Sequence, residues 1–146
     1  MKTRGFGTQK VEEEITHFFP GVKTARMDTD STGSKKAYQQ IIYQFETGET
    51  DILIGTQMIS KGLDFDNVAL VGIMNADNML NFPDFRAFER SFQLMAQVSG
   101  RAGRMHKTGK VIIQTRDKEH PILKNVVEND YQSMFNSQLE IRKQFK

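Results

Sequence analysis

Four short apolar runs, each about the length of a β-strand, are spaced along the chain at residues 23–27, 51–55, 68–74 and 110–115. The last three are rich in Val, Ile and Leu, and their apolar positions are continuous rather than alternating with polar ones. Continuous runs are typical of strands covered on both faces, as in a parallel sheet. The pattern therefore predicts a mostly parallel sheet.

Between these runs, apolar residues recur three or four positions apart, which predicts amphipathic helices. The first ends at Pro20-Gly21, and the hydroxyls of Ser31, Thr32 and Ser34 can cap the second. Alternating strands and helices indicate an α/β sandwich. The helices are expected at residues 8–19, 34–47, 85–99, 122–127 and 131–145.

Composition narrows the class of protein. A length of 146 residues, with 38% hydrophobic and 26% charged residues, fits one globular domain and excludes a disordered chain. No apolar run reaches the roughly 20 residues of a membrane span, and residues 1–20 lack the apolar core of a signal peptide. We therefore expect a cytoplasmic protein without a membrane partner. The net charge of +2 does not indicate whether the protein binds nucleic acid.

The chain contains no cysteine, which excludes a disulfide framework, a thiol nucleophile and a Cys-ligated metal within these residues. Its three histidines, His17, His106 and His120, are too far apart for ligand spacing. We expect no metal site. Residues 12–14, three consecutive glutamates, are expected to form a solvated face near a helix N-terminus.

The most informative segment is residues 97–104, Gln-Val-Ser-Gly-Arg-Ala-Gly-Arg, at the expected end of a helix. Arg101 and Arg104 each follow a glycine, which lets a ligand approach the backbone closely. A guanidinium group offers planar, paired donors to phosphate oxygens. The segment therefore fits an anion clamp, or alternatively a helix that ends in glycine and carries two solvated arginines.

A second polar segment, residues 55–65, follows the second expected strand and contains Thr, Gln, Ser, Lys and two glycines. Ligands gather at the carboxyl ends of parallel strands, where such a loop can present amides and hydroxyls to phosphates. The alternative is an ordinary polar loop in which Asp64 caps the next element. Residues 5–9, at a helix N-terminus, are a weaker candidate for anion binding.

A phosphate-binding loop is absent from the sequence. Residues 31–36 resemble one superficially, but Asp28 occupies the first glycine position and Lys35 does not directly follow Gly33. The chain therefore lacks the loop that would hold ATP phosphates and Mg²⁺.

Residues 55–65 and 97–104 together resemble motifs V and VI of the second RecA-like motor lobe of superfamily 2 helicases. Residues 7–12, 19–22, 83–90 and 119–123 are similar to the bacterial replication-restart helicases, the primosomal protein N′ family. The resemblance implies a RecA-like three-layer sandwich with a mostly parallel sheet. Residues 1–146 would form that lobe, closed by helices in residues 119–146.

The resemblance also implies roles for individual residues. Arg101 and Arg104 would be arginine fingers for ATP held on the other lobe, Gln97 would sense the same phosphate, and Gly62 and Asp64 would border the nucleotide. The residues implied to contact the DNA phosphate backbone are Thr8, Thr56 and Gln57, assisted by Lys61. We expect the carboxyl ends of the strands to bring Thr8, Thr56 and Arg101 toward one surface.

As a whole, the resemblance implies an ATP-dependent DNA helicase of replication restart and primosome assembly. Its partners would be single-stranded or forked DNA, the first helicase lobe and primosome proteins, with ATP and Mg²⁺ held mainly on that first lobe. The family also carries a first lobe and zinc-binding cysteines, which this sequence lacks. We therefore expect a fragment of a larger protein, inactive as an ATPase by itself.

Two other functions fit parts of the pattern. A non-catalytic module for nucleic-acid binding or partner docking is the first, although it would not need both Arg101 and Arg104. A stand-alone nucleotide-binding α/β protein is the second, and the missing phosphate loop argues against it.

Overall fold

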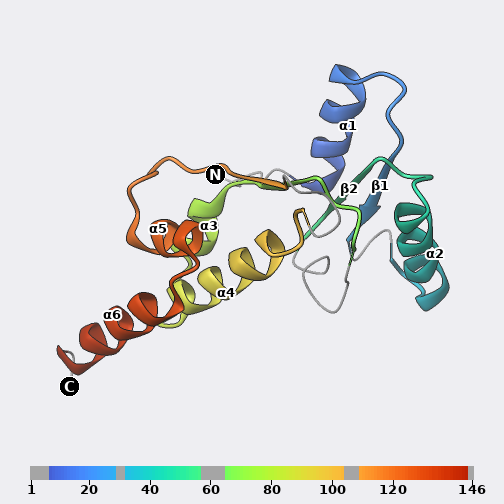
Figure 1. The fold of residues 1–146 in the computed structure, drawn as a ribbon. Helices are drawn as coiled ribbons and strands as arrows, with labels where there is room; N and C mark the ends of the chain where they lie inside the picture. The colour runs from blue at the N-terminus through green and yellow to red at the C-terminus, as the bar shows by residue number, and fades with distance from the viewer. Residues whose placement is uncertain (1–6, 29–31, 57–64, 104–108, 145–146) are drawn as a thin grey trace. The chain divides into compact units, whose positions relative to one another are not determined.

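The computed structural model describes residues 7–28, 32–56, 65–103 and 109–144. The chain divides into two compact units, residues 1–65 and 66–146, and each has its own helices and strands (Figure 1). Among the described residues, no helix is long and apolar enough to cross a membrane.

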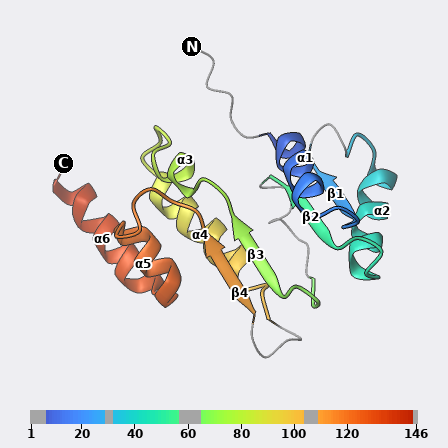
Figure 2. The same cartoon turned by 90° about the horizontal axis from the view of Figure 1, so that it is seen from above.

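The first unit contains one pair of parallel strands between two helices (Figure 2). In chain order the elements are α1 (Thr8–Phe18), β1 (Thr24–Met27), α2 (Lys35–Glu46) and β2 (Ile52–Gly55). Thr24 pairs with Ile52, and Met27 pairs with Gly55, so the two strands end together. The hydroxyl of Ser34 caps α2 by accepting a hydrogen bond from the Ala37 amide at 3.1 Å.

The second unit has another parallel pair, β3 (Leu70–Ile73) with β4 (Lys110–Ile113). Its helices are α3 (Ala76–Leu80), α4 (Ala87–Ser99), α5 (Pro121–Glu128) and α6 (Tyr131–Gln144). Helix α4 is central, because α3, α5 and α6 all contact it. The buried core of this unit comprises Ala76, Leu80, Phe92, Met95, Ile122, Leu123, Val126 and Met134.

A network of hydrogen bonds fixes α3 to the end of β4. The backbone carbonyl of Gln114 accepts from the Ala76 amide at 3.0 Å. The Asp77 carboxylate accepts from the Thr115 hydroxyl at 2.8 Å and from the Arg116 amide at 3.0 Å. The hydrogen bond from Thr115, followed by that from Arg116, lowers the pKa of Asp77 below its ordinary 3.8.

The five expected helices and four expected strands are all present, with ends that differ by a few residues. The structure adds α3, which the sequence pattern did not indicate. The strands form two parallel pairs rather than one described sheet. Leu70 is 57% exposed and Ile112 is 59% exposed, so the described elements of the second unit leave one face of the β3–β4 pair open.

Candidate functional site

The loop that follows α4 carries Arg101. The helix ends at Ser99, and Gly100 continues the turn with its amide donating to the Ala96 carbonyl at 3.0 Å. The Arg101 amide then donates to the Val98 carbonyl at 3.2 Å. Arg101 is only 7% exposed, so the alternative of a solvated arginine is wrong for this residue. Gln97, in the last turn of α4, is exposed.

Two glycines hold this loop close to the start of the β3–β4 pair. The Gly103 amide donates to the Val68 carbonyl at 2.9 Å, and Gly103 has a φ of 83°, where a side chain would be strained. Gly109 lies against the same loop: a Cβ atom there would be 2.3 Å from the Ala102 carbonyl carbon and from the Gly103 nitrogen. The backbone around Arg101 is therefore closely packed.

The loop lies at the amino end of the strands, so the expectation that Arg101 lies at their carboxyl end is wrong. Val68 comes just before β3, and its carbonyl is the acceptor for the Gly103 amide. Because β4 is parallel to β3, the chain after α4 must return to the amino end before β4 can begin. Arg101 lies on that return.

In the first unit, Thr8 and Thr56 come to the same end of a strand pair, as expected. The Thr8 hydroxyl donates a hydrogen bond to the carboxylate of Asp28, the residue that follows β1. Asp28 and Thr56 are each the next residue after the paired Met27 and Gly55. Thr56 is exposed, whereas Asp28 is buried. This carboxyl end is the candidate site for a phosphate chain.

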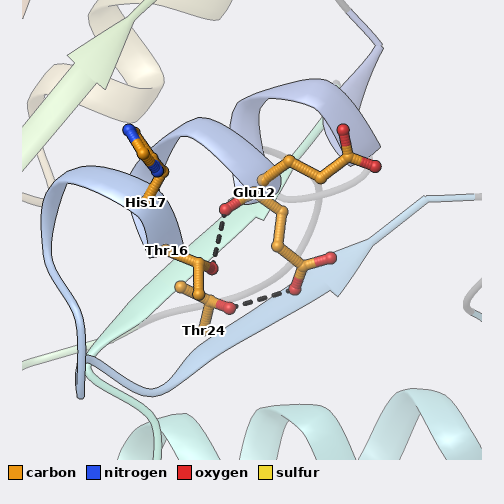
Figure 3. A pocket seen from close by; sticks show the side chains of 5 residues that line it. Glu12, Thr16, His17 and Thr24 are labelled. Carbon is orange, nitrogen blue, oxygen red and sulfur yellow. Dashed lines mark hydrogen bonds between the residues drawn. The ribbon is translucent and has the colours of Figure 1, made fainter.

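A second polar contact ties α1 to β1 one turn further along the helix (Figure 3). The Glu12 carboxylate accepts from the Thr24 hydroxyl at 3.0 Å and pairs with the Arg26 guanidinium at 3.2 Å. An open depression beside this contact is lined by Glu12, Glu13, Thr16, His17 and Thr24. Since its carboxylate is engaged by the strand, Glu12 is structural, and the expectation of a solvated face is wrong for it.

The remaining site candidates lie outside the described residues and stay predictions. They are Gln57, Lys61, Gly62, Asp64 and Arg104. Within the described ranges, no group of three or more His, Asp or Glu side chains could hold a metal ion.

The sequence did not lead us to expect Asp28 at this site. Asp28 was noted only because it replaces the first glycine of a phosphate-binding loop. Its position directly after a strand, at the expected carboxyl edge, is the feature of the sequence that could have indicated it.

Comparison with known proteins agrees with the resemblance to helicases. Residues 6–106 match the helicase conserved C-terminal domain family. The chain is 48% identical over 140 residues to Replication restart protein PriA of Bacillus subtilis, covering 96% of this chain and 17% of that protein. It is 44% identical over 142 residues to the Haemophilus influenzae protein of the same name, covering 97% and 20%.

A third relative, Replication restart protein PriA of Treponema pallidum, is 48% identical over 138 residues, covering 94% of this chain and 21% of that protein. The chain thus spans about a fifth of the length of the curated relatives it matches. The family match covers residues 6–106, more than half of the 146 residues. The chain belongs to the helicase conserved C-terminal domain family.

Proposed function

We propose that this chain is the second motor lobe of an ATP-dependent DNA helicase acting in replication restart and primosome assembly. The observation that carries the proposal is the loop after α4. In this loop Arg101 is buried, and the backbone around it is closely packed. Similarity to replication restart proteins over nearly the whole chain supports the same function. Its partners would be single-stranded or forked DNA, the first helicase lobe and primosome proteins.

In this proposal, Arg101 and Arg104 act on ATP that the first lobe binds. An arginine that is already removed from water interacts strongly with charge that develops on a transferring phosphoryl group, because the local dielectric is low. Gln97, exposed in the last turn of α4, would sense the same phosphate, and Gly62 with Asp64 would border the nucleotide. The first lobe would hold the Mg²⁺ ion and the phosphate chain.

The DNA contact would lie at the carboxyl end of the β1–β2 pair. Thr8 and Thr56 lie at this end, and the segment after Thr56 contains Gln57 and Lys61. Contacts from such residues to the phosphate backbone carry no sequence information, which suits a motor that moves along any DNA.

We infer further that residues 1–146 form one RecA-like lobe of three layers, closed by the helices of residues 119–146. Both strand pairs are parallel, as a single parallel sheet requires. The open face of the β3–β4 pair, with Leu70 and Ile112 exposed, is an apolar surface that a further layer would cover.

Titration of labelled single-stranded DNA tests the nucleic-acid part of the proposal. We expect affinity in the full-length protein to be independent of base sequence and to fall with salt, because binding releases counterions from the phosphates. Thr56→Ala should lower that affinity at each salt concentration, because it removes a hydroxyl that would contact a phosphate. Thr16→Ala, which removes another exposed threonine hydroxyl, should leave it unchanged. Salt-independent binding, or strong preference for one base sequence, would contradict the proposal.

The motor part is tested by ATP hydrolysis. The chain alone should hydrolyse no ATP, whereas the full-length protein should hydrolyse it when single-stranded DNA is added. Hydrolysis by the chain alone would instead favour a stand-alone nucleotide-binding protein.

A further inference from the structure

We propose that Asp28 is a positioning residue for DNA binding, which holds Thr8 at the carboxyl end of the β1–β2 pair. This inference rests on the proposed function. Asp28 is 7% exposed, and its carboxylate accepts a hydrogen bond from the Thr8 hydroxyl. Its backbone carbonyl accepts from the Thr32 amide at 3.0 Å. Asp28 is thus held through its backbone and in turn holds the first residue of α1.

The charge of Asp28 argues for positioning rather than for direct contact with DNA. A carboxylate repels a phosphate, so it cannot itself add affinity for a polyanion. Among the described residues, Arg26 pairs with it, with Nη1 4.0 Å from the carboxylate, and Arg26 also pairs with Glu12. A buried, compensated carboxylate at this edge serves to fix its neighbours.

The hydrogen bond also defines how Thr8 can contact a phosphate. A hydroxyl group has one proton, and the Thr8 proton is donated to Asp28. Phosphate oxygens accept hydrogen bonds, so the donor left to Thr8 is its backbone amide. As the first residue of α1, Thr8 has no acceptor for that amide within the helix. Asp28 therefore acts through the hydrogen bond from the Thr8 hydroxyl. This bond fixes the Thr8 backbone, whose amide is the group that contacts the phosphate.

Glu12 provides a matched control because it also ties α1 to β1 but does not bond to Thr8. Asp28→Ala and Glu12→Ala each remove one negative charge and the contacts that its carboxylate makes between α1 and the β1 segment. A difference in DNA binding between them points to groups that Asp28 contacts and Glu12 does not, of which Thr8 is one. Asp28→Asn removes the charge and keeps an oxygen acceptor for the Thr8 hydroxyl.

The experiment measures the affinity of the full-length protein for labelled single-stranded DNA over a series of salt concentrations. Asp28→Ala should weaken binding roughly tenfold, the effect of one lost hydrogen bond to a charged group. The slope of log affinity against log salt should stay near its wild-type value, because a neutral amide contact releases no counterions in the way that Lys and Arg contacts do. Glu12→Ala and Asp28→Asn should keep nearly the wild-type affinity.

A double-mutant cycle isolates the pair. Thr8→Ala alone should behave like Asp28→Ala, and the double variant should lose no more affinity than either single variant. Losses that multiply would show that the two residues act independently and would overturn the proposal. Circular dichroism on each variant confirms that the change in affinity is not caused by loss of folded protein.

The outcomes separate this inference from the proposed function. If Thr56→Ala lowers the affinity and Asp28→Ala does not, only the role of Asp28 is overturned. If neither substitution lowers the affinity, the DNA-binding edge itself is wrong, and the role of Asp28 with it. An Asp28→Asn variant with the reduced affinity of Asp28→Ala would contradict an anchor that works through a hydrogen-bond acceptor.

Discussion

The amide of Gly103 donates to the carbonyl of Val68 at 2.9 Å, which fastens the loop after α4 to the segment that leads into β3. Arg101 lies two residues before Gly103, so this hydrogen bond restricts the backbone that presents its side chain. The role proposed for Arg101, contact with a phosphoryl group, needs such a rigid support.

Gly109→Ala should destabilise the protein and displace the loop that carries Arg101. The new Cβ would lie 2.3 Å from backbone atoms of Ala102 and Gly103, which cannot rotate away as a side chain can. We expect a loss of about 1 to 3 kcal/mol in the free energy of unfolding, typical of overpacking. Gly72→Ala is the control, since its Cβ would meet nothing within 4 Å. Equal stability of the two variants in urea titrations would contradict the packing described here.

Asp77 should make stability depend on pH in the acid range. Its pKa is lowered in the folded protein, chiefly by the hydrogen bond from Thr115, so its contribution is fully present above the unfolded value near 3.8. That contribution should be lost as pH falls through the lowered folded value. In Asp77→Asn, this pH-dependent part should disappear.

Urea titrations between pH 7 and pH 3 measure the effect. The difference in unfolding free energy between wild type and Asp77→Asn should be constant above about pH 5 and shrink below pH 4. A difference that does not change with pH would exclude the ionised Asp77 as its source.

The carboxylate of Asp130 should stabilise the first turn of α6. Its carboxylate accepts from the Ser133 amide at 2.9 Å and from the Ser133 hydroxyl at 2.6 Å, and these bonds lower its pKa. In Asp130→Ala, amides in the first turn of α6 should exchange with solvent faster, because one of them loses its acceptor. Asp130→Asn keeps an acceptor and should retain most of the protection. Unchanged exchange in the alanine variant would show that the cap contributes nothing.

The helices and strands could be predicted because their information is local. Thr8–Phe18 and Lys35–Glu46 each repeat apolar residues at helical spacing, and Ser34 caps the second of them as its position indicated. Helix α3 could not be predicted in this way. It has five residues, fewer than two helical turns, and its ties to Gln114 and Thr115 come from nearly 40 positions away in the sequence.

The site was predictable in part for the same reason. Thr8 and Thr56 were placed correctly at one edge, since each flanks a strand or helix whose direction follows from parallel pairing. The prediction that Arg101 lies at the carboxyl end of the strands was wrong, because a loop that precedes a parallel strand must lie at the amino end of that strand. The role proposed for Asp28 depends on a contact across 20 residues, whereas its place after a strand indicated only that it lies at this edge.

ATP hydrolysis by the full-length Arg101→Ala variant tests the central claim most directly, when it is measured beside DNA binding. Arginine fingers contribute about 10³ to 10⁵ in rate, or roughly 4 to 7 kcal/mol of transition-state stabilisation. We therefore expect Arg101→Ala, and likewise Arg104→Ala, to lose most DNA-stimulated hydrolysis and to keep nearly normal DNA affinity. Arg90→Ala, at the other end of α4, is the control and should hydrolyse ATP normally. Near-normal hydrolysis in Arg101→Ala, or a loss of DNA affinity in proportion to activity, would contradict the finger assignment and favour a non-catalytic binding module.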